Sequence, residues 1–195
     1  MDRPNANFVY AHRQKVPFVH THSDFAHFGG GISGMGNLTK TGRDQTVVSA
    51  GQLLVDGVLT TNPASLTSVA ANAILGGNGL VCGPTTVQNG GALAPGANGI
   101  GQLTVSNHVT FTGGSCAMME ITKNGGVSVN DLLFVSGTLT QAGSLVVTNL
   151  GTEVLAAGDR CKLFNALKFA GAFTNFSLPP LAANLIRTWV NIRDP

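Results

Sequence analysis

The amino-acid sequence predicts an all-β fold and, within that class, a parallel β-helix, also called a β-solenoid. Only 10% of the 195 residues are charged and 26 are glycine, whereas charged residues make up about 25% of an ordinary soluble domain. Apolar residues reach 43%, which is enough for a hydrophobic core. From Ile32 onward, short apolar or alternating runs end repeatedly in Gly, Asn or Asp, a pattern typical of β-strands joined by tight turns.

Each expected strand follows from one of these runs, which recur at about ten to twenty residues, close to half a turn or one turn of a solenoid. In chain order the runs are NLTKTG, GQLLVDG, AILGGNG, TTVQNGGALAPG, GQLTVSNHVTF, CAMMEI, DLLFVSGTLT, GSLVVTNLG and KLFNA. No segment carries a long apolar stripe of helical period. The best helical candidate, residues 63–73, is predicted to be a loop or a single turn.

In a solenoid, equivalent residues of successive coils stack, so inward positions form apolar ladders while Gly and Asn occupy the corners. We therefore expect nine side chains to point inward and to be buried: Leu53, Val55, Val87, Leu93, Leu103, Val105, Leu139, Leu145 and Val147. An antiparallel sandwich or jelly roll, built from equally short strands, is the alternative architecture.

Several longer motifs stand in an order that characterises one family. They are GGISGMGNLTKTG, VSAGQLLVDG, the block from AILGGNG to LTVSNHVTF, MMEITKNGGVSVNDLLFVSGTLTQAGSLVVTN and LAAGDRCKLFNALKFAGAFTNFSLPPL. Through them, residues 30–183 resemble the autotransporter-associated β-strand repeat (passenger-associated transport repeat) of bacterial surface proteins. The sequence departs from the family where RDQTVVSAGQLLV shortens a repeat, and at Arg160, Cys161, Leu167 and Lys168. The resemblance implies a fragment of a right-handed parallel β-helix from a cell-surface or secreted protein.

Three regions follow from this layout: a His-rich N-terminal tail (1–29), the β-solenoid repeat domain (30–183) and a C-terminal tail (184–195). Neither tail matches the family, and both are expected to be poorly ordered. The opening residues, MDRPNANFVYAHRQK, contain charges without a following apolar segment, so no signal peptide is visible. No stretch reaches the roughly 18 apolar residues of a membrane span.

Charge and cysteine content exclude some partners and sites. The net charge is +2, Lys123 is the only Lys or Arg between Asp44 and Asp159, and no basic face is interleaved with aromatic residues. A nucleic-acid partner is therefore not expected. The three widely spaced cysteines, which form no CxxC pair, indicate neither a disulfide framework nor a zinc knuckle; they are Cys82, Cys116 and Cys161.

The stretch VHTHSDFAHFGG (residues 19–30) contains four candidate metal ligands: His20, His22, Asp24 and His27. Imidazoles on alternate residues of a loop can converge on one ion. The stretch resembles the H-x-H-x-D-H motif of the metallo-β-lactamase superfamily, which includes lactonases, but Phe25 stands where that motif has its third histidine. A zinc site, incidental divalent-metal binding and a solvated tail without metal all remain open.

Two acidic residues of the repeat domain are candidates for catalysis. Glu120 and Asp131, if adjacent coils bring them together, would form an acid and base pair for a sugar substrate. Asp131 follows Asn130, a sequence equally typical of a turn. Oxygen-bearing residues near Gly turns, namely Asn124, Asn130, Asp131 and Asp159, are possible Ca²⁺ ligands.

Two classes of function follow. The favoured hypothesis is a structural or adhesion-type β-solenoid segment that requires no cofactor. Its expected partners are further copies or repeats, met through the solenoid ends, and surface glycans. The alternative is a small hydrolase, dependent on a divalent metal (Zn or Ca), acting on an ester, a lactone resembling an N-acyl homoserine lactone, or a glycoside.

Overall fold

The computed structural model describes residues 45–59, 62–96 and 99–186. In this part of the chain every regular element is a β-strand, and no helix occurs. The strands are β1 (Thr46–Val48), β2 (Gly51–Leu54), β3 (Val58–Leu59), β4 (Thr67–Val69), β5 (Ala73–Gly77), β6 (Leu80–Val81), β7 (Thr85–Val87), β8 (Ala92–Pro95), β9 (Gln102–Val105), β10 (Val109–Phe111), β11 (Cys116–Asn124), β12 (Val127–Asn130), β13 (Leu132–Gln141), β14 (Ser144–Asn149), β15 (Phe164–Gly171) and β16 (Asn175–Ser177).

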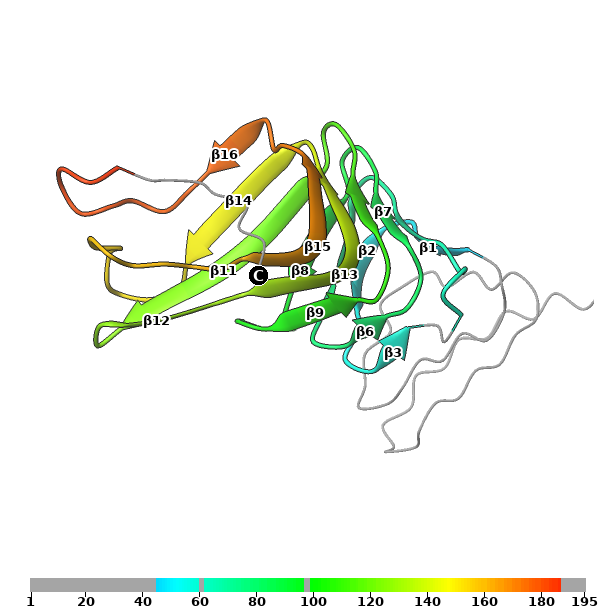
Figure 1. Cartoon of the computed structure of the whole chain (residues 1–195), viewed down its shortest axis with the longest axis horizontal. Helices are drawn as coiled ribbons and strands as arrows, with labels where there is room; N and C mark the ends of the chain where they lie inside the picture. The colour runs from blue at the N-terminus through cyan, green and yellow to red at the C-terminus, as the bar shows by residue number, and fades with distance from the viewer. Residues whose placement is uncertain (1–44, 60–61, 97–98, 187–195) are drawn as a thin grey trace, which may run out of the picture.

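Successive strands wind into coils that have three faces and stack along one axis (Figure 1). The first face contains β1, β4, β7 and β10, the second contains β2, β5, β8, β11, β14 and β16, and the third contains β3, β6 and β9. Strands β13 and β15 each cross from the third face to the first, which joins these two faces into one sheet. Except between β11 and β12, paired strands are parallel. The predicted parallel β-helix is thereby confirmed, and the antiparallel sandwich is wrong.

Apolar side chains at equal depth in successive coils form the core. On the second face Leu53 lies opposite Leu75, Leu75 opposite Leu93, and the same line continues through Ala117 and Leu145. Of the nine residues expected to point inward, eight are buried; Leu53, in the outermost strand of its sheet, is partly buried and packs against the core.

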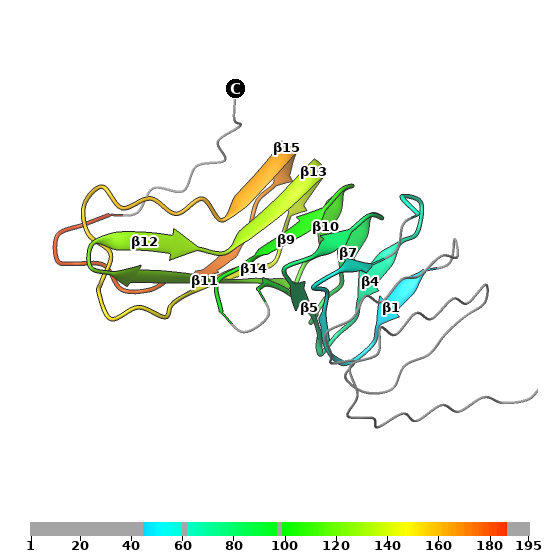
Figure 2. The same ribbon diagram turned by 90° about the horizontal axis from the view of Figure 1, so that it is seen from below.

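The coils differ in length: Thr46 pairs with Thr67, 21 positions later, and from the next coil onward the length rises from 18 to 30 positions. Thr67 pairs with Thr85, 18 positions later, and Thr85 pairs with Val109 after 24. Val109 then pairs with Leu139 after 30 positions, and Leu139 pairs with Phe169 after another 30. The two long coils contain an inserted hairpin, β11–β12, and a loop over residues 150–163. The insertions project to one side of the stack, away from β1, β4 and β7 (Figure 2).

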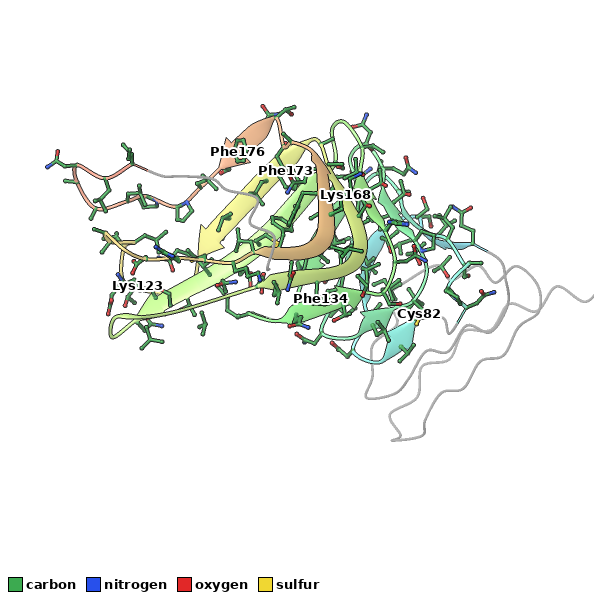
Figure 3. The ribbon with its side chains drawn as sticks, viewed as in Figure 1. Cys82, Lys123, Phe134, Lys168, Phe173 and Phe176 are labelled. Atoms are coloured by element: carbon green, nitrogen blue, oxygen red, sulfur yellow. The ribbon has the colours of Figure 1, made fainter. Side chains whose placement is uncertain are left out.

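Aromatic residues fill the interior at the C-terminal end of the solenoid (Figure 3). Phe173, in the corner between β15 and β16, is only 4% exposed. Its ring lies 5.6 Å from the rings of both Phe111 and Phe164. Phe176 continues the line of Leu145 but is 48% exposed, because β16 is the last strand of its sheet.

Two expectations from the sequence need comment. The loop or single turn expected at residues 63–73 is wrong in part, because Thr67–Val69 forms β4 between β1 and β7. The isolated run is too short to show strand character and acquires it by pairing with its neighbours. The N-terminal tail, the domain boundary at residue 30 and residues 187–195 of the C-terminal tail lie outside the described residues.

Threonines form a buried polar line on the first face. Thr46, Thr67 and Thr85 are paired in register, and Thr67 and Thr85 are at most 1% exposed. The hydroxyl oxygens of all three have no hydrogen-bond partner. A buried hydroxyl without a partner loses its hydration without compensation.

We expect Leu103→Asp to lower the free energy of unfolding by several kcal/mol, because Leu103 is 0% exposed and the substitution buries an unpaired charge. Gln102→Asp is the matched control, since Gln102 precedes it in β9 and is exposed, and it should change stability by less than about 0.5 kcal/mol. Urea unfolding followed by circular dichroism measures both. Equal effects would contradict the inward ladder.

We expect Thr67→Val to raise the free energy of unfolding by about 1 kcal/mol, because it removes an unpaired buried hydroxyl and retains the β-branched shape. Thr86→Val changes the neighbouring half-buried position in β7 and serves as the comparison. The same urea titration applies. A destabilised Thr67→Val variant would show that the hydroxyl line contributes favourably to the fold.

Candidate functional site: the β11–β12 hairpin

The β11–β12 hairpin is the largest departure from regular coils in the described part of the chain. Its turn is Asn124-Gly125-Gly126, and both glycines have positive φ, 59° and 76°. Residues with a Cβ atom rarely adopt this left-handed region, whereas glycine adopts it readily. The conformation suits the tight turn of a two-stranded hairpin. β-Branched residues on both sides of the turn favour extended strands. The local sequence therefore specifies a hairpin where a regular coil would turn a corner.

The hairpin has an inner and an outer face. On the inner face Ile121 is 1% exposed and Lys123 is 6% exposed. The outer face carries Val127, 65% exposed, and Val129, 51% exposed, which lie opposite Asn124 and Thr122 of β11. Val127 and Val129 lie on the same face of the hairpin, two positions apart in β12, and are two of ten exposed large apolar side chains among the described residues.

The segment of residues 149–153 runs alongside the last residues of β11 and holds the hairpin in place. The N–H of Leu150 donates to the carbonyl of Ile121 at 2.7 Å, and the N–H of Glu153 donates to that of Lys123 at 3.3 Å. The Glu153 carboxylate accepts the N–H groups of both turn glycines, Gly125 and Gly126. The turn is thus fixed by a residue 27 positions further along the chain.

The Lys123 side chain extends from the inner face of the hairpin to Asp159, near the end of the loop over residues 150–163. Its Nζ lies 2.7 Å from Oδ2 of Asp159, and Figure 3 shows Lys123 in the projecting part of the molecule. The N–H of Ala156 and the Lys123 ammonium hold the pKa of Asp159 below its usual range. This pair was not predicted from the sequence, in which the available signal was a single Lys in an otherwise acidic stretch.

Asp131 fixes the base of the hairpin. Oδ1 accepts the N–H of Gly101 at 2.8 Å and Oδ2 accepts the N–H of Glu120 at 2.6 Å. The N–H of Asp131 donates to the Glu120 carbonyl at 2.8 Å. Asp131 is 1% exposed, and burial raises the pKa of its carboxyl to about 6, against the opposing effect of the two N–H donors, with the nearby Glu120 charge adding to the rise.

The structure places Glu120 and Asp131 next to each other at the base of the hairpin, within one coil and not on adjacent coils as the hypothesis assumed. Main-chain donors occupy both oxygens of Asp131, and the residue links the hairpin to the preceding coil. This arrangement explains the position of Asp131 by its structural role and gives no support to an acid and base pair. Their catalytic role remains an untested prediction.

The candidate metal ligands His20, His22, Asp24 and His27 lie outside the described residues. Within the described ranges, no group of three or more His, Cys, Asp or Glu side chains is arranged to hold a metal ion. His108, at the start of β10, accepts the N–H of Thr138 through Nδ1 at 2.8 Å, which ties two coils together. The three cysteines are free.

The possible Ca²⁺ ligands serve other contacts. Asn124 Oδ1 accepts from Thr152, Asn130 Nδ2 donates to the carbonyl of Lys162, and Asp131 and Asp159 are engaged as above. No helix among the described residues is long and apolar enough to span a bilayer.

We expect Asp131 to make stability fall as pH rises from about 4 to about 6. Its folded pKa of about 6 exceeds the usual Asp value of 3.8, so the folded state keeps a proton that the unfolded state has lost. The favourable contribution is complete below pH 4 and absent above pH 6. Asp131→Asn should remove this slope and also lower stability at every pH, because its amide accepts only one of the two N–H groups.

The measurement is the free energy of unfolding from urea titrations at a series of pH values, for the wild-type and variant chains. The difference in the slope of unfolding free energy against pH, between the wild type and Asp131→Asn, separates the contribution of Asp131 from those of the other carboxylates. Glu120→Gln, which removes the neighbouring negative charge, should shift the sloping region to lower pH. Parallel pH profiles for the wild type and Asp131→Asn would contradict the assignment.

Comparison with known proteins agrees with the repeat architecture. No protein-family model matches the chain. A curated relative, the adhesin BmaC autotransporter of Brucella suis biovar 1 (strain 1330), is 34% identical over 106 residues, which are 51% of this chain. The matched region is 3% of that relative, so the chain spans a small fraction of its length. The described coils and this similarity together relate the chain to a segment of an autotransporter adhesin.

Proposed function

We propose that this chain is an adhesion-type β-solenoid segment of a bacterial surface or secreted protein. The observation that carries the proposal is the 34% identity to an autotransporter adhesin over half of the chain. The continuous parallel coils support it, because a solenoid is an extended scaffold that presents long, regular surfaces to partners. No metal or cofactor is required for this role.

The outer surface suits an uncharged, hydroxyl-rich partner. On the first face Ser68 of β4 is buried, at 7% exposed, so the row begins with Thr86 and continues in register through Thr110 and Thr140 on three successive coils, where all three are half-buried. All of them alternate with inward residues, so they form a flat hydroxyl-bearing row on the outside. Hydroxyl groups both donate and accept hydrogen bonds. We therefore propose surface glycans as the partner class for this face.

Adhesion can be measured with fluorescent beads coated with the full chain and incubated with host epithelial cells. We expect coated beads to bind several-fold more than albumin-coated beads. Leu103→Asp should abolish the excess because it disrupts the coils, whereas Gln102→Asp should preserve it. Mild periodate oxidation of the cell surface should reduce binding, because it destroys sugar diols.

Binding no greater than that of albumin-coated beads would overturn the adhesive role. Binding that survives periodate but is lost after protease treatment of the cells would exclude glycans as the partner and retain adhesion. Thr86→Arg combined with Thr110→Arg, on the outward row, should weaken binding without unfolding the chain. Unchanged binding by this variant would overturn the assignment of the first face.

A further inference from the structure

The outer edge of β12 is open. Within the described residues β12 pairs with β11 on one side, and no strand pairs with its other side. The loop that contains Asp159 contacts the hairpin through Lys123, and the Lys162 carbonyl in the same loop accepts from the Asn130 side chain of β12. In Figure 2 the hairpin strand β12 projects away from the stacked strands of the first face. Open edges pair readily with other strands.

Antiparallel geometry tells which main-chain groups face this edge. The N–H of Asp131 donates to the carbonyl of Glu120, and hydrogen-bonded pairs alternate along an antiparallel ladder. Val129 and Val127, two and four residues away, therefore direct their main-chain groups toward β11. The N–H and C=O of Ser128, between them, point outward from the hairpin. Ser128 is thus the centre of the available edge.

The geometry points to a second copy of this chain as the occupant of the edge, paired antiparallel about a two-fold axis at Ser128. In this register each Ser128 exchanges two main-chain hydrogen bonds with its symmetry mate. Val127 of one chain lies opposite Val129 of the other, on both sides of the axis. These are non-hydrogen-bonded pairs, in which opposed side chains approach most closely. Four exposed valines become one apolar cluster.

Charge and sequence agree with self-pairing. Strand β12 is Val-Ser-Val-Asn, without the Lys, Pro or inward charge that commonly protects edge strands. The Glu153 carboxylate holds the turn from within the same molecule, so the edge is already ordered before a partner arrives. Preorganisation reduces the entropy cost of pairing.

The contact is weak by itself. Stable specific interfaces bury about 1,200–2,000 Å², and a strand of four residues provides much less. A single pair is therefore transient in solution. Many copies held on one surface increase its strength through effective concentration. The inference concerns the isolated chain and does not depend on the proposed adhesive role.

Sedimentation velocity of the full chain, from micromolar to millimolar concentration, tests the proposal. We expect reversible dimerisation that weakens at least about tenfold, equivalent to 1.4 kcal/mol, in a Val127→Lys/Val129→Lys chain and in a Val127→Glu/Val129→Glu chain. Mixing these two chains should restore association, because each Lys then faces a Glu. Both double variants change the exposed residues Val127 and Val129, and circular dichroism verifies that the variant chains fold.

Two further variants localise the contact. Ser128→Pro removes the outward N–H and leaves the ladder with β11, since proline is tolerated at the outward positions of edge strands; it should also weaken dimerisation. Leu167→Lys, at a 76% exposed residue of β15 at the solenoid end, is the matched control and should have no effect.

A wild-type chain that remains monomeric at millimolar concentration would overturn the proposal. So would charged variants that associate like the wild type while Leu167→Lys does not, because the contact would then lie at the solenoid end. A mixture of the Lys and Glu chains that stays monomeric would overturn the two-fold register.

Discussion

Parallel stacking of inward side chains in register is the constraint on which the rest of this molecule depends. Each coil shares main-chain hydrogen bonds with the coils before and after it, so its strands must match theirs in position and depth. Leu75 and Leu93 are completely buried because they occupy equivalent positions of neighbouring coils. The only freedom left to the chain is at the corners, where segments can lengthen without disturbing the ladders.

The hairpin shows how that freedom is used. Once β11 extends past the stack, its inner face loses the support of the next coil, and residues 150–163 take over that support from outside. Polar contacts replace apolar ladders here: Lys123 pairs with Asp159, Glu153 binds the turn, and Asp131 attaches the base. The close approach also requires Gly151, because any Cβ at that position would collide with the main chain of Lys123.

The same departure from the stack creates the open edge. Strands in the middle of each face have neighbours on both sides, whereas within the described residues β12 pairs with β11 alone. A long scaffold whose hairpin carries an open strand combines a rigid support with a weak contact that many copies can add together. This combination is consistent with a segment of a surface adhesin, where the number of copies determines the strength of attachment.

The all-β class, the parallel coils and most of the core could be predicted from the sequence. Those properties depend on short-range patterns: alternation along each strand, recurrence of similar runs, and Gly or Asn at the corners. Leu93, Leu103 and Leu145 were identified as inward from such patterns, and all three are fully buried. Strand β4 was not identified, because Thr67–Val69 is short and polar and becomes a strand only between β1 and β7.

The organisation of the site could not be predicted from the sequence, because it depends on contacts that form in the folded chain. Asp131 bonds to Gly101, 30 positions away, and Lys123 pairs with Asp159 across 36 positions; no local pattern indicates either partner. The sequence placed Glu120 and Asp131 as possible neighbours, but their roles depend on the main-chain donors around them. Those donors come from segments that are distant in sequence, and folding alone brings them together.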